Sequence, residues 1–145
     1  MSTPGDSGAR RALVLVAAGY RDLEFWYPVL RLREAGVEVE IRASSAEDTL
    51  RSELGYPVIA DGEMKGVDGA VYDVVVVPGG AAGKALASDA DAVALLKSVA
   101  ASGGRVVTIG SGRAATDAAG VAASGYDDAD GLPPAMRELL AGLAR

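Results

Sequence analysis

The sequence predicts an α/β fold, in which a mostly parallel, doubly wound sheet carries helices on both faces. Short, continuous apolar runs are typical of strands buried on both sides, and they occur at residues 12–16, 74–77 and 106–109. Stretches with apolar residues at helical spacing separate these runs. Because strands that alternate with helices join into parallel sheets, we expect one domain of this kind over residues 11–145.

The first part of the sequence predicts a lead-in segment and, after the first strand, a helix. Residues 1–10 are rich in Ser, Gly, Pro and Thr and are expected to form a disordered lead-in. After the first strand, a helix is predicted from Leu23 to Ala35, with Asp22 as its N-cap and Gly36 as its stop. The apolar positions at helical spacing are Leu23, Phe25, Trp26, Val29, Leu30 and Leu32.

Alternating apolar residues at 37–41 predict a second strand, and the Gly- and Pro-containing stretch 50–69 predicts a small hairpin excursion. Beyond the strand at 74–77, the turn Pro78-Gly79-Gly80 is expected to enter a helical region that reaches Val99.

The last strand, at 106–109, is expected to lead into a helix at 112–119. A closing helix is predicted over 133–143, since its two prolines suit a first turn. One side of it would carry Met136, Leu139, Leu140 and Leu143. Ligands of such sheets bind beyond the carboxyl ends of the strands, which directs attention to residues 19–24, 78–84 and 110–113.

The composition excludes several classes of function. The net charge is −6 without a cluster of Lys or Arg, so neither nucleic acid nor an anionic membrane is expected as a partner. No apolar stretch approaches the ~20 residues of a spanning helix, and we expect a cytoplasmic protein. The chain contains no Cys and no His, which excludes thiolate attack, imidazole catalysis and most zinc sites. We therefore expect no metal and no cofactor.

The run from Arg105 to Ala115 is the most informative part of the chain. A buried strand breaks there into a helix, the arrangement by which α/β enzymes place a Cys or Ser at the top of the sheet. This chain has Gly110 at the apex, followed by Ser111. No base is visible near Ser111 in the sequence, so we interpret its hydroxyl as a hydrogen-bond donor rather than a nucleophile.

Two nucleotide-binding patterns nearly match and are rejected. Residues 110–115 fit a dinucleotide fingerprint, but no strand ending in an acidic residue follows. Residues 79–84 resemble a phosphate loop, but one residue is missing between the glycines and Ala85 replaces the hydroxyl that would hold magnesium.

The order of these motifs resembles the ThiJ/PfpI superfamily of cysteine-dependent hydrolases, hydratases and glyoxalase-like enzymes. The resemblance is carried by residues 13–16, 20–28, 31–36, 55–58, 72–80, 110–112 and 132–139. It implies a flavodoxin-like sheet of the class I glutamine amidotransferase type, a small-molecule metabolite as ligand and a homodimer.

The chain differs from this family at the positions that the resemblance implies to be catalytic. The resemblance implies an acidic residue at position 21, a cysteine at 110 and commonly a histidine at 111, where this chain has Arg21, Gly110 and Ser111. The interval 124–131 is too short for the family's further strands, so the C-terminal region is expected to be shortened and to leave one side of the pocket, or a sheet edge, open.

An anion-friendly pocket is nevertheless expected to remain, because backbone amides after residue 79 and around Ser111 would attract a carbonyl oxygen or carboxylate. The candidate proton carriers are Glu24 and Asp22. The resemblance often implies an acid at position 24 too, whereas Asp22 is also explained as a simple N-cap. Arg21 lies at the pocket mouth or on the surface, Arg113 is expected to pair with Asp117, and Tyr20 suits the core at least as well as the site. The candidate site residues are Glu24, Asp22 and Ser111 for catalysis, and Arg21, Tyr20, Gly79, Gly80, Gly110, Gly112 and Arg113 for substrate binding.

These observations predict a divergent protein that binds a small carbonyl-containing or anionic metabolite. The reaction would be non-covalent, such as hydration, elimination, isomerisation or cyclisation, and the composition suggests a setting in specialised metabolism. A catalytically silent ligand-binding or scaffold protein is the alternative, and a covalent reaction through Ser111 is a weaker third hypothesis.

Overall fold

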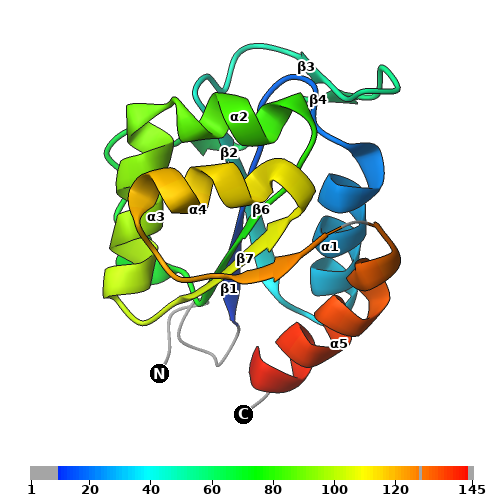
Figure 1. The fold of residues 1–145 in the computed structure, drawn as a ribbon, viewed down its shortest axis with the longest axis vertical. Helices are drawn as coiled ribbons and strands as arrows, with labels where there is room; N and C mark the ends of the chain where they lie inside the picture. The colour runs from blue at the N-terminus through cyan, green and yellow to red at the C-terminus, as the bar shows by residue number, and fades with distance from the viewer. Residues whose placement is uncertain (1–9, 128, 144–145) are drawn as a thin grey trace.

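The computed structural model describes residues 10–127 and 129–143, in which six parallel strands form one sheet (Figure 1). The strands follow the order β5-β2-β1-β6-β7-β8. Their bounds are Arg11–Leu15 for β1, Glu38–Ala43 for β2, Gly62–Glu63 for β5, Val74–Val77 for β6, Arg105–Ile109 for β7 and Ser124–Tyr126 for β8. The sheet confirms the predicted α/β fold, and the order from β2 to β8 is the flavodoxin-like one.

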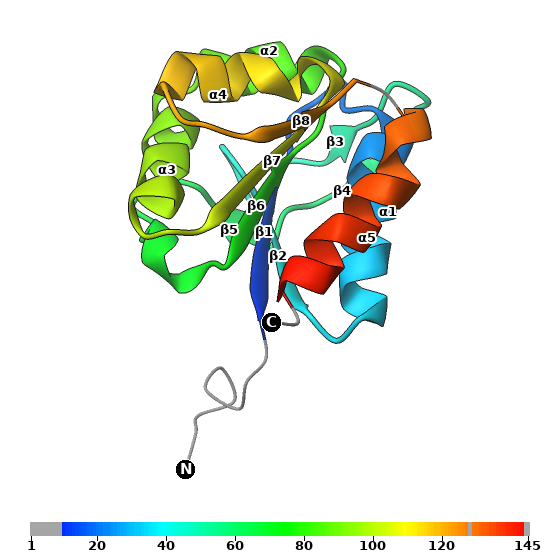
Figure 2. The ribbon, with the colours of Figure 1, turned by 60° about the horizontal axis from the view of Figure 1, so that its bottom comes forward.

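Helices cover both faces of this sheet (Figure 2). On one face lie α1 (Asp22–Glu34) and α5 (Leu132–Leu143), and on the other lie α2 (Ala81–Ala87), α3 (Ala90–Ala101) and α4 (Arg113–Ala119). Three short 3-10 turns are η2 (Gly69–Val71), η3 (Gly110–Gly112) and η4 (Ala129–Gly131). Within the described residues, no helix has both the length and the apolar character needed to cross a bilayer.

The alternation of β1 divides the core into two layers. Ala12, Val14 and Val16 belong to the cluster that includes Phe25 of α1 and Met136 of α5. Leu13 and Leu15 belong to the cluster on the opposite face, with residues of α2, α3 and α4. Burial on both faces is the reason why this strand reads as a continuous apolar run.

Three elements differ from the sequence prediction. The helical region after residue 80 is two helices, because the Asp89 carboxylate accepts hydrogen bonds from the amides of Asp91 (2.9 Å) and Ala92 (3.3 Å) and starts α3 anew. The strands β5 and β8 were not predicted, since they contain two and three residues respectively and include glycine. The hairpin is confirmed as the antiparallel pair β3 (Leu50–Arg51) and β4 (Pro57–Val58). Of the expected lead-in, all but Arg10 lies outside the described residues.

The start of α1 corrects two predictions. Arg21 occupies the N-cap position, and Asp22 is the first helical residue. The Asp22 carboxylate instead accepts hydrogen bonds from Ser52 Oγ (2.6 Å) and the Leu54 amide (3.3 Å), and so ties the hairpin to the helix. The predicted apolar positions also divide between two faces, since Leu23 and Leu30 are 61% and 57% exposed. The closing helix is confirmed, with Met136 and Leu139 buried.

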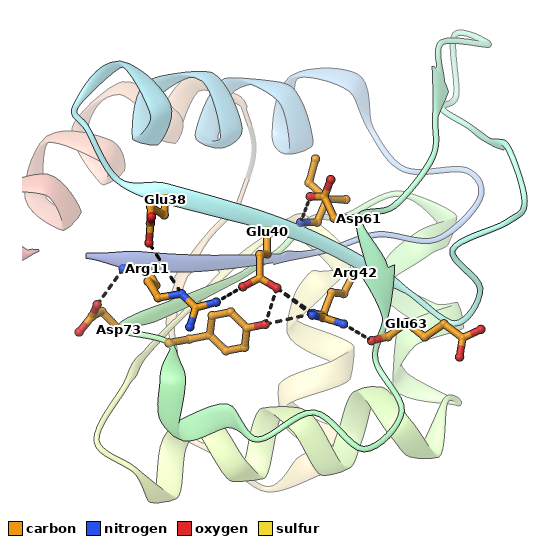
Figure 3. A network of polar contacts seen from close by, with 9 residues as sticks. Arg11, Glu38, Glu40, Arg42, Asp61, Glu63 and Asp73 are labelled. Atoms are coloured by element: carbon orange, nitrogen blue, oxygen red, sulfur yellow. Dashed lines mark hydrogen bonds and ion pairs between the residues drawn. The ribbon is translucent and has the colours of Figure 1, made fainter. Parts of the chain in front are cut away.

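A polar network joins β2 to the neighbouring strands β1 and β5 at one edge of the sheet (Figure 3). The Glu40 carboxylate on β2 accepts hydrogen bonds from Arg42 Nη2 (2.8 Å) and the Tyr72 hydroxyl (3.1 Å), and it pairs with Arg11 on β1. Arg42 also donates to the Glu63 carbonyl on β5 (2.6 Å). Although burial acts in the opposite direction, the hydrogen bonds from Arg42 and Tyr72 lower the pKa of Glu40 below its usual value.

We expect this network to make stability depend on pH. Because the folded pKa of Glu40 is lowered, its contribution is complete above the ordinary glutamate pKa of about 4.3 and is lost as pH falls through the folded value. Between about pH 6 and about pH 3, Glu40→Gln should therefore lose about 1 kcal/mol less of its unfolding free energy than the wild type does. Urea unfolding at both pH values measures this difference.

Glu47→Gln is the matched control, because Glu47 is exposed and no ion pair among the described residues involves it. Equal losses of stability in the wild type and in Glu40→Gln would contradict the proposed role of the network.

Candidate functional site

Glu24 lies at the point where three segments of the chain meet. Its carboxylate projects from the first turn of α1 and is only 1% exposed. Oε1 accepts a hydrogen bond from the Gly79 amide in the turn between β6 and α2 (2.9 Å). Oε2 lies 3.5 Å from Nη1 of Arg21. The carboxylate therefore links α1 to the carboxyl end of β6.

The contact with Gly79 requires glycine at that position. A Cβ atom on Gly79 would lie 2.3 Å from Oε1 of Glu24 and 2.9 Å from the Ile109 carbonyl oxygen. The Gly79 amide, expected to bind a substrate oxygen, is in this structure engaged by Glu24.

Gly110 confirms the predicted apex after β7 and brings the turn against Glu24. Its φ is +54°, in the left-handed region that favours glycine. A Cβ atom built on Gly110 would lie 3.3 Å from both carboxylate oxygens of Glu24. The resemblance implied an acid beside the apex at position 21, and often an acid at position 24 as well. In the structure Glu24 lies there, because it projects from the first turn of α1 toward the turn after β7.

Ser111 and Gly112 complete the turn in different ways. The Ser111 hydroxyl donates a hydrogen bond to the Gly80 carbonyl oxygen (2.7 Å), as a donor role predicts. This bond joins the two turns that end β6 and β7. Gly112 is buried against the chain, since a Cβ atom there would lie 2.2 Å from the Val77 carbonyl oxygen. Gly112 therefore packs against β6 and does not line the site.

An open pocket of about 550 Å³ lies at the carboxyl ends of these strands. Its charged lining consists of Arg21, Lys84, Arg113, Glu53 and Asp127. Its remaining lining consists of Gly80, Ala81, Gly110 and Ser111. The space expected between Gly80, Ser111 and Arg21 is therefore present.

The charges around this pocket are mostly paired. Arg21, with a side chain 53% exposed, lies 3.4 Å from Glu53. The carboxylates of Glu24 and Glu53 raise the pKa of the Arg21 guanidinium above its usual value. Arg113 pairs with Asp127 (2.8 Å) and not with Asp117 as predicted, because the chain after β8 returns to the start of α4.

Two other candidates lie away from this pocket. Tyr20 is fully buried, with its ring 4.8 Å from that of Phe25 and its hydroxyl donating to the Tyr56 carbonyl oxygen (2.9 Å). Burial raises the pKa of the Tyr20 phenol. Its side chain belongs to the core and does not line this pocket. Asp22 lines a neighbouring hollow of about 420 Å³ together with Glu24, Leu23 and Leu54. Arg21 and Glu53 line both this hollow and the larger pocket.

Sequence reasoning missed three pocket residues, namely Glu53, Lys84 and Asp127. Glu53 comes from the hairpin and Asp127 from the segment after β8, so only the fold brings them to the site. The sequence could have identified Lys84, since this residue lies within the stretch 78–84, which was assigned to the ligand-binding end of the sheet. Among the described residues, no group of His, Cys, Asp or Glu side chains is arranged to hold a metal ion.

Comparisons with known proteins identify the family and the fold. Residues 10–126 match the model of the DJ-1/PfpI family. A relative in Thermococcus kodakarensis named Deglycase TK1284 is 35% identical over 111 residues, which are 77% of this chain and 66% of that protein. An Archaeoglobus fulgidus protein of unassigned function is 36% identical over 87 residues, 60% of this chain and 51% of its own length. The chain thus spans between half and two thirds of these relatives.

Solved structures share the fold. The crystal structure of Drosophila melanogaster DJ-1beta superposes with a TM-score of 0.83 at 21% identity and covers 94% of this chain and 91% of its own. A low identity of this kind supports the fold alone.

Gly79→Ala tests the packing of Glu24 against the β6–α2 turn. The added methyl group would clash with Oε1 of Glu24 and should destabilise the protein by about 1–3 kcal/mol, as overpacked sites do. Urea unfolding measures the effect. Gly131→Ala is the control, because its Cβ would meet its nearest neighbour at an ordinary 3.5 Å. Equal stability of the two variants would mean that Glu24 does not constrain this turn.

Proposed function

The chain belongs to the DJ-1/PfpI family, and we propose that it binds a small carbonyl-containing or anionic metabolite and catalyses a non-covalent acid–base reaction. The observation that carries this proposal is the buried Glu24 carboxylate, which lies against Gly110 of the open pocket and lines the neighbouring hollow of about 420 Å³. Hydration, elimination, isomerisation and cyclisation are the reactions that such a group can serve.

Glu24 is the proton carrier in this proposal. One of its oxygens holds the Gly79 amide, which fixes the orientation of the carboxylate. The other oxygen has only the distant Arg21 contact at 3.5 Å and is available to take and return a proton. Asp22 is not assigned this role, because both of its oxygens hold the hairpin.

Backbone amides support the binding of a substrate oxygen. The Ala81 amide is used by the Gly19 carbonyl (3.1 Å) and the Gly79 amide by Glu24. The amides of Gly80 and Ser111 have no acceptor among the described residues, and both residues line the pocket. Donors fixed in this way stabilise negative charge that develops on a carbonyl oxygen.

The apex residue argues against covalent chemistry. The chain has neither Cys nor His, and the Ser111 hydroxyl is engaged by the Gly80 carbonyl oxygen. The name deglycase describes the Thermococcus relative, whereas the glycine at position 110 favours a reaction without an enzyme-bound intermediate. The same loss of a nucleophile supports the second candidate function, a binding protein without catalysis.

Glu24→Gln tests the catalytic role. The amide side chain can still accept from Gly79, but it cannot move a proton, so turnover should fall at least about 100-fold while the melting temperature stays near that of the wild type. Pyruvate, glyoxylate and glycolaldehyde serve as probes, with products followed by NMR.

Glu34→Gln, at the far end of α1, is the matched control. An unchanged rate in Glu24→Gln would contradict the acid–base proposal. Stabilisation of about 2.7 kcal/mol by a probe at 100 times its Kd, without any product, would instead support the silent binding protein.

We also propose that the chain forms a homodimer through the outer face of α1 and the hairpin. Leu23 and Leu30 are exposed on this face of α1, and Leu54 beside them is 86% exposed. The hairpin adds Tyr56, whose ring stacks edge-on against Trp26 at 5.8 Å. Apolar side chains gathered in this way suit a symmetric contact with a second copy.

The double substitution Leu23→Glu with Leu30→Glu should convert a dimer to a monomer, because it buries charge in the proposed contact. Light scattering coupled to size-exclusion chromatography measures the mass. Val71→Glu, an exposed apolar position on η2, is the control and should leave the mass unchanged. A monomeric wild type would exclude the dimer.

A further inference from the structure

We propose that a cavity between the β7–β8 side of the sheet and α5 binds a small zwitterion with an apolar side chain, the chemistry of an apolar α-amino acid. The cavity has a volume of about 370 Å³, which falls within the range of about 300–1,000 Å³ usual for small-molecule sites. It shares no lining residue with the pocket at the carboxyl ends of the strands. We call it the α5 cavity, and it is a second site, separate from the proposed function.

The α5 cavity opens at the edge of the sheet. The edge strand is β8 (Figure 2), which pairs with β7 so that Ser124 lies beside Val107 and Tyr126 beside Ile109. Because side chains alternate along a strand, Ser124 and Tyr126 face α5, as Val107 does. Ser124 is exposed, so a ligand can enter the cavity at this edge.

Apolar side chains form the floor of the α5 cavity. Val107 from β7 and Ala135 and Leu139 from α5 line it, and they are 6%, 3% and 5% exposed. Ala122 and Ala123, in the segment before β8, line it as well. An aliphatic group placed against these residues is removed from water, so the floor favours a ligand with a short apolar side chain.

Arg105 supplies a positive charge to the α5 cavity. It lines the cavity at the start of β7. Among the described residues, its guanidinium group makes neither an ion pair nor a hydrogen bond. The group lies against α5, where a Cβ atom on Gly142 would come within 2.5 Å of Cζ. A guanidinium group presents parallel N–H donors that match a carboxylate.

Glu138 supplies the opposite charge on the same side of α5. It precedes Gly142 by four residues, so the two positions share a face of the helix. Its Oε2 accepts a hydrogen bond from the Tyr126 hydroxyl (3.1 Å), and its Oε1 has no partner among the described residues. Although Glu138 and Arg105 line the same cavity, no ion pair joins them.

Two opposite charges that line one cavity without pairing select a ligand that carries both. The carboxylate of the ligand would pair with Arg105 and its ammonium group with Glu138, and both contacts are charge-assisted hydrogen bonds. A carboxylate alone would be repelled by Glu138, and an amine alone by Arg105. An α-amino acid carries the two groups on one carbon atom, which suits charges that lie about one helical turn apart.

L-valine, isovalerate and isobutylamine test the α5 cavity. They share the branched apolar group, but isovalerate lacks the ammonium group and isobutylamine lacks the carboxylate. Binding to the full ¹⁵N-labelled chain is followed by NMR titration, with the amides of Val107, Ser124 and Leu139 as reporters. We expect L-valine to bind at least about tenfold more tightly than either of the others, the size of one hydrogen bond to a charged group.

Two variants assign each charge of the ligand to its partner. Arg105→Gln should weaken the binding of L-valine until it equals that of isobutylamine, because the carboxylate then has no partner. Glu138→Gln should instead make L-valine and isovalerate bind equally, because the ammonium group then has none. Each variant abolishes one preference and keeps the other, which a general loss of structure would not do.

Arg137→Gln is the matched control, because Arg137 is exposed on α5 next to Glu138 and does not line the cavity. It should keep both preferences of the wild type. Equal affinities of L-valine and isovalerate for the wild type would overturn the zwitterion as the ligand. An L-valine response confined to the amides of Gly80 and Ser111, or no response at all, would overturn the α5 cavity as a site. Neither result bears on the proposed function, since the two sites have different reporters.

Discussion

The hydrogen bond between the Gly79 amide and the Glu24 carboxylate is the interaction on which the site depends. A carboxylate that is 1% exposed is strongly destabilising unless polar groups satisfy it. The Gly79 amide does so at 2.9 Å, and this short reach requires glycine at position 79. The same bond fixes the first turn of α1 against the end of β6, and the pocket opens where these elements meet β7.

A second hydrogen bond holds the site together without using a side chain at position 110. The Ser111 hydroxyl holds the Gly80 carbonyl oxygen at 2.7 Å, which joins the turn after β6 to the turn after β7. Neither this bond nor the one to Glu24 involves a side chain at position 110. The backbone can therefore keep its left-handed turn with glycine there, and the loss of a nucleophile leaves the surrounding frame in place.

The sequence predicted the elements that bury apolar faces, but it did not predict the partners of the carboxylates. The runs at β1, β6 and β7 were found because burial on both faces forces continuous apolar residues. Asp22 reads as an N-cap from local pattern alone, yet its partners are Ser52 and Leu54, 30 and 32 residues away. Arg113 likewise has a plausible partner one helical turn away, but Asp127 is reached through the pairing of β8 with β7. Short strands such as β5 and β8 carry too few residues to show a period.

The short segment after β7 was expected to leave one side of the pocket, or a sheet edge, open. In the structure, Asp127 of this segment lines the pocket. Because β8 ends at Tyr126, the next residue lies directly over the turn after β7, and its carbonyl oxygen comes within 3.6 Å of the position of a Cβ on Gly110. The side chain of Asp127 also holds Arg113 at the rim. The residue that follows this short strand thus lies against the apex turn and lines the pocket. The pocket of this protein is consequently shaped by two changes that act at one place, the glycine at the apex and the early end of β8.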